Sequence, residues 1–275
     1  DGIITNIQYS PDSSGGSSTY TVTGEDVSVM MDMEERYEEH PGQPEFVIAG
    51  KIILSYARYG LIPMAIPPLS PDIPLPIERI PTQQGTDLEY LNEMAKRFGY
   101  VFYIIPGPAP LTNTAYWGPP IRMGLPQRAL SVNLGHASNV VSINFSYNAL
   151  SATKVDGEVQ DRISEKVFPV KTFFAKRLPP LAAMPALNPI SPSKTQKFSY
   201  SGYTVSQAQS HAQGMTDSSV DSVASATGEL DVLRYGNILW PRSLVSLRGA
   251  GYSNDGLCYV KTVTHKIKRG EYSQS

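Results

Sequence analysis

The sequence is poor in cysteine and in long apolar runs. Cys258 is the one cysteine among 275 residues, so the chain cannot form a disulfide within itself. This favours a reducing compartment such as the bacterial cytoplasm. No apolar run reaches the roughly 18 residues that a transmembrane helix needs, and the longest apolar-rich stretch, residues 46–60, is interrupted by Lys51 and Arg58. The sequence therefore predicts no transmembrane segment.

An excess of one charge is also missing. The chain has 23 Lys and Arg residues against 25 Asp and Glu residues, which gives a formal net charge of -2. A general nucleic-acid binder is expected to be strongly basic, so the composition argues against nucleic-acid recognition. Hydrophobic residues make up 41% of the chain, which is enough for a sizeable core in one large domain or in two to three small ones.

The motifs of catalysis and metal binding are absent from the sequence. The chain has four histidines, His40, His136, His211 and His265. None of them stands at zinc-ligand spacing from another His, Cys or acid. Neither H-E-x-x-H nor the nucleophile elbow G-x-S-x-G occurs. Gly50-Lys51 is followed by Ile52, where a phosphate-binding loop needs Ser or Thr. We therefore expect no catalytic residue, no metal site and no cofactor.

Two features keep other functions open. Four acids that cluster in sequence are Asp217, Asp221, Glu229 and Asp231. Paired carboxylates can hydrolyse a glycan, so a cell-wall hydrolase is one alternative, but we prefer to interpret these acids as a solvated helix face. Tyr116-Trp117, in a stretch rich in Pro and Gly, suggests a peptidoglycan- or carbohydrate-binding module. The first alternative predicts lytic activity that is lost when Asp217 or Asp221 is changed, and the second predicts binding to sacculi.

The amino-terminal third alternates between turn residues and periodic segments. Residues 2–9 and 18–24 alternate on either side of a Ser- and Gly-rich turn at residues 11–16, which predicts a hairpin. Residues 24–36 predict a short helix. A second helix is expected to start at Pro44 and to end at Gly60. Residues 61–81 hold seven prolines and suit an extended connector or an edge strand.

The clearest helix is expected over residues 85–100. Thr86 and Glu89 form the T-x-x-E capping box. The apolar stripe consists of Leu88, Leu91, Ala95 and Phe98. Gly99 is the expected carboxyl-terminal stop, and an apolar strand follows it at once.

The second half of the chain reads mostly as strands. Strands are expected at residues 128–135 and 139–149, and a Pro-rich excursion at 179–195. A helix is expected to begin at Thr204 with a second capping box and to end at Gly228. The order of elements predicts an α+β protein rather than a doubly wound one.

The carboxyl-terminal stretch predicts one long alternating strand over residues 257–268. The face that we expect to pack on a core carries Leu257, Tyr259, Lys261, Val263, His265 and Ile267. The other face becomes basic toward Lys268-Arg269, just before a turn at Gly270. Two interpretations stay open: a solvated hairpin tip whose lysines protect an edge strand from aggregation, or a contact with another chain or with a lumen.

Several segments together resemble a known family. The segments are DGIITNIQYSPD, STYTVTGEDVSVMMDMEER, GTDLEYLNEMAKRFGYVFYI, ATKVDGEVQDR and GAGYSNDGLCYVKTVTHKIKRGEYSQS. They resemble the phage late control protein D family, the baseplate hub of contractile tails and of contractile injection systems, which is similar to the hub half of the VgrG spike proteins. The resemblance is collinear over nearly the whole chain, but the spike repeats and a lysozyme-like module are missing from the sequence. It also makes us expect the chain to be part of a longer polypeptide.

The resemblance implies two β-barrel-like tube domains with inserted helical and irregular segments. The implied segments are a first tube domain at 1–45, a helical middle domain at 46–127, a second tube domain at 128–165 and 230–275, and an excursion at 166–229. Each hub subunit would then supply two tube-like domains, so that three subunits offer six.

The function that the resemblance implies is structural and involves no catalysis. A homotrimer would join the six-fold inner tube protein above it to a three-fold spike protein below it, with baseplate wedge or adaptor proteins outside. It would assemble in the bacterial cytoplasm and become part of a phage tail or an injection particle. The residues that we expect at an inter-subunit or axial contact are Tyr259, Lys261, His265, Lys268 and Arg269.

Overall fold

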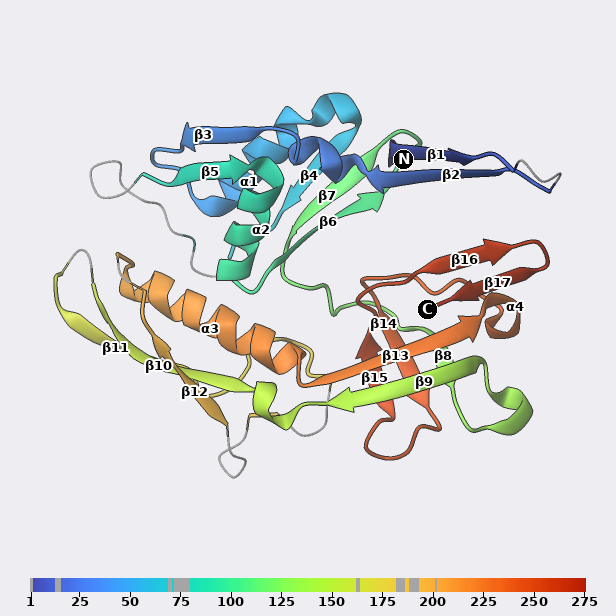
Figure 1. The fold of residues 1–275 in the computed structure, drawn as a ribbon. Coiled ribbons are helices and arrows are strands. Elements are labelled where there is room, and N and C mark those ends of the chain that lie inside the picture. The colour runs from blue at the N-terminus through green and yellow to red at the C-terminus, as the bar shows by residue number, and fades with distance from the viewer. Residues whose placement is uncertain are drawn as a thin grey trace. The chain divides into compact units, whose positions relative to one another are not determined.

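The structure, a computed structural model, describes residues 2–12, 16–68, 71, 80–161, 164–181, 186–187, 193–200 and 202–275. The chain divides into two compact units, Asp1–Pro119 and Pro120–Ser275. Both units mix helices with a larger share of strands (Figure 1), which confirms the predicted α+β class. No helix in the described ranges is long and apolar enough to cross a membrane.

The first unit consists of short strands around two helices. Its elements are β1 (Gly2–Ser10), β2 (Thr19–Asp26), the 3-10 turn η1 (Val27–Met31), β3 (Glu35–Glu39), α1 (Glu45–Ser55), the 3-10 turn η2 (Ala57–Tyr59), β4 (Leu61–Ala65), β5 (Thr82–Thr86), α2 (Asp87–Arg97), β6 (Val101–Pro106) and β7 (Asn113–Gly118). β1 pairs with β2 and β3 with β5, while β7 lies between β4 and β6 in a three-stranded sheet.

The core of the first unit lies where the two helices meet this three-stranded sheet. Ile48 and Ile53 of α1, Leu91 and Met94 of α2 and Trp117 of β7 are fully buried. The Trp117 Nε1–H donates a hydrogen bond of 3.1 Å to the Leu91 carbonyl. This bond satisfies the indole inside the core and fixes α2 against the sheet.

Both predicted helices are present, although α1 ends at Ser55 and not at the predicted Gly60. α2 has the complete capping box, in which the Thr86 side chain accepts from the Glu89 N–H and the Glu89 carboxylate accepts from the Thr86 N–H. α1 begins after Pro44, and Gly60 closes the turn that follows it with a φ of 78°. Local residue chemistry is enough to set these boundaries.

The helix predicted over residues 24–36 is wrong. The structure has only the 3-10 turn Val27–Met31, capped by Asp26, whose carboxylate accepts from the Ser28 N–H at 2.7 Å. Glu35–Glu39 then pairs antiparallel with β5. The long-range pairing outweighs the local helix propensity of this charged segment. Residues 61–81 begin with β4, and residues 69–70 and 72–79 of that Pro-rich stretch lie outside the described residues.

The second unit holds three sheets and one long helix. Its elements are β8 (Gln127–Ser131), η3 (Gly135–Ala137), β9 (Val140–Tyr147), η4 (Ala149–Ser151), β10 (Thr153–Gln160), β11 (Val167–Lys171), β12 (Lys194–Phe198), α3 (Val205–Asp221), β13 (Ala224–Asp231), α4 (Val232–Tyr235), β14 (Leu244–Arg248), β15 (Gly256–Tyr259), β16 (His265–Lys268) and β17 (Glu271–Gln274). The strand orders are β11-β10-β12, β16-β17-β13-β9 and β15-β14-β8.

α3 lies along one face of the sheet β11-β10-β12 (Figure 1). The helix starts at the predicted capping box of Thr204 and Gln207. Its Ala208 and Ala212 pack on Val155, Val170 and Phe198 of the sheet. Small residues on the helix and branched residues on the strands let the two layers approach closely. Part of the excursion that precedes the helix, residues 182–185 and 188–192, lies outside the described residues.

Gly228 is not the end of α3, as the sequence predicted, but a residue of strand β13. The helix ends at Asp221, and Gly228 faces Ile143 of β9 in an antiparallel pair. A Cβ at this position would stand 2.7 Å from the Ser142 carbonyl oxygen. Glycine is therefore needed here because a second backbone approaches closely.

The single terminal strand predicted over 257–268 is wrong. β15 pairs with β14, the chain then crosses over through residues 260–264, and β16 joins β17 in a different sheet. The Val260 N–H still bonds to Ser243, whereas the Thr264 N–H already bonds to Ser275. The residues that pack on the local core are Cys258, Val260, Val263 and Tyr272, while Ile267 is exposed. The crossover breaks the alternation that the sequence suggested.

Within the residues that the structure describes, each sheet is a linear series of strands with two edge strands. The two tube domains and their boundaries stay a prediction. β10, assigned by the resemblance to the second tube domain, pairs with β11 and β12 of the excursion.

Candidate assembly surfaces

The structure separates the five predicted contact residues into two groups. His265, Lys268 and Arg269 lie together on the hairpin of β16 and β17, and Gly270 forms the turn with a φ of 80°. Tyr259 ends β15 and is half-buried, and Lys261 is exposed in the crossover. The hairpin therefore carries three of the five predicted residues, with Lys268 and Arg269 beside its turn and His265 at its other end.

Side-chain contacts of Gln274, His265 and Tyr272 fix the hairpin of β16 and β17. The Gln274 side chain is buried, and it accepts from the Leu239 N–H and donates to the Leu239 carbonyl, both at 2.9 Å. It thus behaves like one more residue of a strand. The His265 ring stacks on Tyr272, and its Nδ1 lies 2.8 Å from the Tyr272 hydroxyl. These contacts fix the direction in which the cationic tip points.

The tip of the hairpin combines a strand edge with positive charge. β16 is the outermost strand of the sheet β16-β17-β13-β9. Lys266, Lys268 and Arg269 are exposed, and none of them forms an ion pair with a residue that the structure describes. Lysines on such an edge can prevent pairing with other strands, and they can equally meet an acidic partner. Both interpretations of this hairpin stay open.

The clustered acids of the second unit have structural partners. Asp221 pairs with Arg122 and, at 2.7 Å, with Arg177. Asp217 accepts hydrogen bonds from the Gln213 side chain and from the Lys176 N–H. Asp231 caps α4. Because these acids serve in ion pairs and caps, the structure gives no pair of free carboxylates at the positions that the hydrolase interpretation needs.

The aromatic pair that suggested a carbohydrate site is buried. Tyr116 is 2% exposed and Trp117 is fully covered, so neither can stack on a sugar ring. Cys258 is half-buried, and burial raises the pKa of its thiol, which therefore stays protonated at neutral pH. In the residues that the structure describes, no three His, Cys, Asp or Glu side chains gather in a way that could hold a metal ion.

An exposed apolar surface lies on the hairpin of β1 and β2. Ile7 pairs with Val22 and Tyr9 with Tyr20, and because side chains alternate along a strand, all four point to the same face. Each is between 49% and 63% exposed. We call these residues the apolar hairpin face.

The reverse side of this hairpin is polar. Gln8 pairs with Thr21, and Asn6 with Thr23. The hairpin thus has the pattern of a strand pair that is covered on one face and solvated on the other, although the described residues of the chain leave both faces open. A lone two-stranded hairpin is at best marginally stable in water. The sequence predicted the hairpin but not its exposure, because alternation does not tell which element covers the apolar side.

A second exposed surface is the acidic strand β3. Its alternate residues Glu35, Tyr37 and Glu39 are exposed, while Arg36 and Glu38 are half-buried. Tyr37 is 69% exposed. We call Glu35, Tyr37 and Glu39 the acidic strand face.

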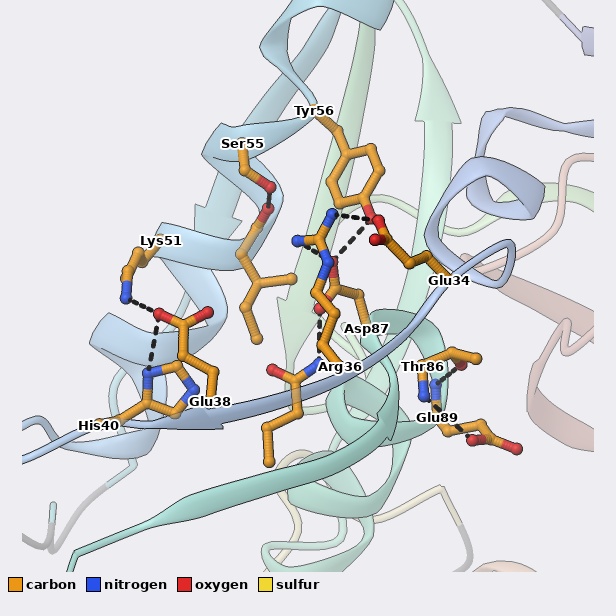
Figure 2. A network of polar contacts seen from close by, with 12 residues as sticks. Glu34, Arg36, Glu38, His40, Lys51, Ser55, Tyr56, Thr86, Asp87 and Glu89 are labelled. Carbon is orange, nitrogen blue, oxygen red and sulfur yellow. Dashed lines mark hydrogen bonds and ion pairs between the residues drawn. The ribbon is translucent and has the colours of Figure 1, made fainter.

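The acidic strand is anchored by the buried carboxylate of Asp87. Figure 2 shows the side chains that converge on it from several elements. Arg36 Nη1 lies 3.0 Å from Asp87 Oδ2, the Tyr56 hydroxyl donates to the same oxygen at 2.7 Å, and the Gln83 amide donates to Oδ1 at 2.6 Å. The Asp87 side chain is 2% exposed. A buried carboxylate is tolerated when it is paired and hydrogen-bonded in this way.

The electrostatics of this network follow from burial and from Asp87. Burial raises the pKa of Tyr56, and the hydrogen bond to Asp87 raises it further, so that the phenol remains a donor. Arg36 also touches Glu34 at 3.2 Å. The sequence revealed the capping box beside Asp87 but not Arg36 as its partner, because the two residues are brought together only by the pairing of β3 with β5.

His40 is a second buried titratable group at the end of the acidic strand. It is fully covered and stacks on Tyr90, and its Nδ1 lies 4.0 Å from Glu38 Oε1 (Figure 2). Burial lowers the pKa of His40 more than the neighbouring Glu38 raises it. Glu38 itself accepts a hydrogen bond from Lys51, which lowers the pKa of Glu38.

Comparison with solved structures identifies a shared fold over nearly the whole chain. The structure is similar to a tail protein from Neisseria meningitidis, with a TM-score of 0.67 and 14% identity over 99% of this chain and 77% of that one. It is also similar to the 43 kDa tail protein of prophage MuSo2 from Shewanella oneidensis, with a TM-score of 0.59 and 12% identity over 98% of this chain and 74% of that one.

A third similar structure is the E. coli c3393 protein, a component of the type VI secretion system with structural similarity to the bacteriophage T4 tail proteins gp27 and gp5. Its TM-score is 0.61, with 13% identity over 99% of this chain and 58% of that one. No protein-family model and no curated protein matches the sequence. Identities this low mean that the comparison shows a common fold.

Proposed function

We propose that the chain is a structural hub protein of a contractile tail or a contractile injection system. Three copies form a ring that joins a six-fold inner tube on one side to a three-fold spike on the other. The ring carries out no chemical reaction. Its role is to convert one symmetry into the other through contacts between surfaces.

The observation that carries this proposal is the apolar hairpin face. Four large side chains, each between 49% and 63% exposed, share one face of a two-stranded hairpin. Contiguous exposed apolar patches of this kind mark protein interaction sites. A ring subunit can bury such a face against a neighbour.

The shared fold supports the same conclusion. The similar solved structures are named as tail proteins and as a component of a secretion system that resembles phage tail proteins. The similarity runs over 98% or more of this chain in each case. The hub interpretation also includes Lys268 and Arg269 at the hairpin tip, His265 at the opposite end of the same hairpin, and Tyr259 and Lys261 before it, as inter-subunit or axial contacts.

Light scattering of the purified chain over a concentration series tests the proposal. We expect a mass of three chains, with a fraction that rises with concentration. If the isolated chain is a monomer, the same measurement is repeated with the inner tube and spike proteins encoded beside it. A chain that stays single with both proteins present contradicts the hub function.

A further inference from the structure

Three arginines surround one cavity in the second unit. Arg128 of β8, Arg234 of α4 and Arg248 at the end of β14 line a cavity of about 320 Å³, together with His136 of η3. Three separate elements thus bring their arginines to one place. The arginines were not singled out by the sequence, because they are far apart along the chain.

The cavity has positive charge without a counter-ion. No Asp or Glu lines it among the residues that the structure describes. Elsewhere in the described part of the chain, Arg36, Arg122 and Arg177 each lie beside a carboxylate. Arg128, Arg234 and Arg248 form no such pair with a described residue. All three arginines are exposed, so water and salt screen their mutual repulsion, and an anion from outside the chain can reach them.

The arginines are held in position by their surroundings. Arg248 Nε donates to the Ser131 hydroxyl at 2.8 Å, which restricts the position of its guanidinium group. The Tyr235 hydroxyl donates to the Arg128 carbonyl at 2.6 Å. Gly236 has a φ of 69°, and a Cβ there would lie 2.7 Å from Arg128 Nη1, so glycine leaves the room that this guanidinium occupies.

A guanidinium binds a carboxylate through two parallel hydrogen bonds. Carboxylates that lack a cationic partner are available on this chain itself. Glu35 and Glu39 of the acidic strand face are exposed, and neither forms an ion pair with a described residue. The Arg36–Asp87 contact fixes the strand that presents them.

We propose that the cavity of Arg128, Arg234 and Arg248 binds a glutamate of the acidic strand face, Glu35 or Glu39, from a second copy of the chain. The contact joins two different surfaces, so successive copies repeat it around a ring. This inference rests on the proposed hub function, since it assigns a contact between its subunits. Charge pairs of this kind set register and partner choice more than raw affinity.

Cross-linking between two different chains tests the contact directly. All chains carry Cys258→Ser, one population carries Glu39→Cys, and a second, tagged population carries Arg234→Cys. After mixing and mild oxidation, or with a short bifunctional thiol reagent, we expect a dimer of one tagged and one untagged chain. The matched control replaces Glu39→Cys by Glu158→Cys, another exposed strand acid, and is expected to give no cross-link.

Charge reversal at the two surfaces is a second test of the contact. R234E/R248E and E35R/E39R are each expected to weaken self-association by at least about tenfold. The combination of all four substitutions is expected to restore it, and the control K194E is expected to change nothing. Association measured by light scattering is the readout, and circular dichroism verifies that each variant is folded.

The outcomes separate this inference from the hub function. If the wild-type chain forms trimers and neither the cross-link nor the loss on reversal is seen, the cavity contact is overturned and the hub function stands. If R234E/R248E weakens the trimer but the addition of E35R/E39R does not restore it, the cavity does not bind the acidic strand face. A wild-type chain that stays single with tube and spike present overturns both.

Discussion

At the scale of single residues, Asp87 links three parts of the first unit. Its carboxylate receives hydrogen bonds from Tyr56 after α1 and from Gln83 of β5, and it pairs with Arg36 of β3. The charge is buried, so each partner offsets part of the cost of removing it from water. The acidic strand face therefore depends on a residue that it does not itself contain.

Asp87→Ala should lower the free energy of unfolding of the first unit by about 3 kcal/mol, because it leaves a guanidinium and a buried phenol without their acceptor. In a Trp240→Phe background, Trp117 is the single tryptophan, and its fluorescence in urea reports this unit. The surface pair of Glu93 and Arg97 provides the control, since Glu93→Ala should cost less than about 0.5 kcal/mol. Equal effects of the two substitutions would contradict the network.

His40 should make the stability of the first unit depend on pH. Its folded pKa lies below the ordinary value of 6.5, so the unfolded chain binds more protons as the pH falls below that value. The stabilisation is thus complete above about pH 6.5 and declines as the pH falls toward the folded pKa. The groups that face His40 are Glu38, Lys51 and Asp87.

Urea unfolding at pH 7, 6 and 5 measures this dependence. His40→Gln, which stays neutral, should show a flatter curve than the wild type over this range. His40 is the one histidine of the first unit, and carboxylates titrate mainly at lower pH. An unchanged slope in the variant would mean that another group causes the pH dependence.

At the scale of elements, the hairpin of β1 and β2 carries the main prediction. Ile7→Thr with Val22→Thr keeps β-branched residues in the strands but removes apolar side chains from the exposed face. We expect about 100-fold weaker self-association if both side chains are buried in the ring. The matched control on the polar face, Gln8→Thr with Thr21→Ser, should change the association little. Equal association for both variants would exclude the apolar hairpin face from the interface.

Strand β13 offers a second test at this scale. Gly228→Val should lower the stability of the second unit by about 1–3 kcal/mol, because the new Cβ meets the Ser142 carbonyl oxygen. Ala226→Val on the same strand is the control, since Ala226 is exposed. Thermal unfolding followed by circular dichroism distinguishes them. If both valines were tolerated equally, the close approach of β9 and β13 would be wrong.

The elements also show how far the sequence could be read. The ends of α2 and the start of α3 were predictable because Thr86, Glu89 and Thr204 act on neighbouring backbone. The place of Gly228 in strand β13 was not predictable, because its partner strand β9 lies far away in the sequence. β3 was missed since its charged residues carry no apolar alternation, and its pairing with β5 decides its structure.

The candidate surfaces were predictable only in part. The terminal hairpin was found from its cations, and the structure keeps His265, Lys268 and Arg269 together. The crossover between two sheets separated Tyr259 and Lys261 from them. The apolar hairpin face and the arginine cavity could not be predicted, because exposure and convergence depend on which elements leave a face uncovered.

At the scale of the whole molecule, the surfaces suit a repeated contact. An apolar face and an acidic strand lie on the first unit, and an arginine cavity and a cationic hairpin lie on the second. A subunit with unlike surfaces associates head to tail, and such contacts either close into a ring or run on as a filament. The hub account requires closure at three copies.

Electron microscopy of the chain mixed with its inner tube protein tests that requirement most directly. Two-dimensional averages viewed along the axis would give both the number of copies and the symmetry of the ring. The account predicts rings of three chains with pseudo-six-fold density where the ring meets the tube. Single particles of one chain that leave the tube end bare, or open filaments of this chain, would contradict it.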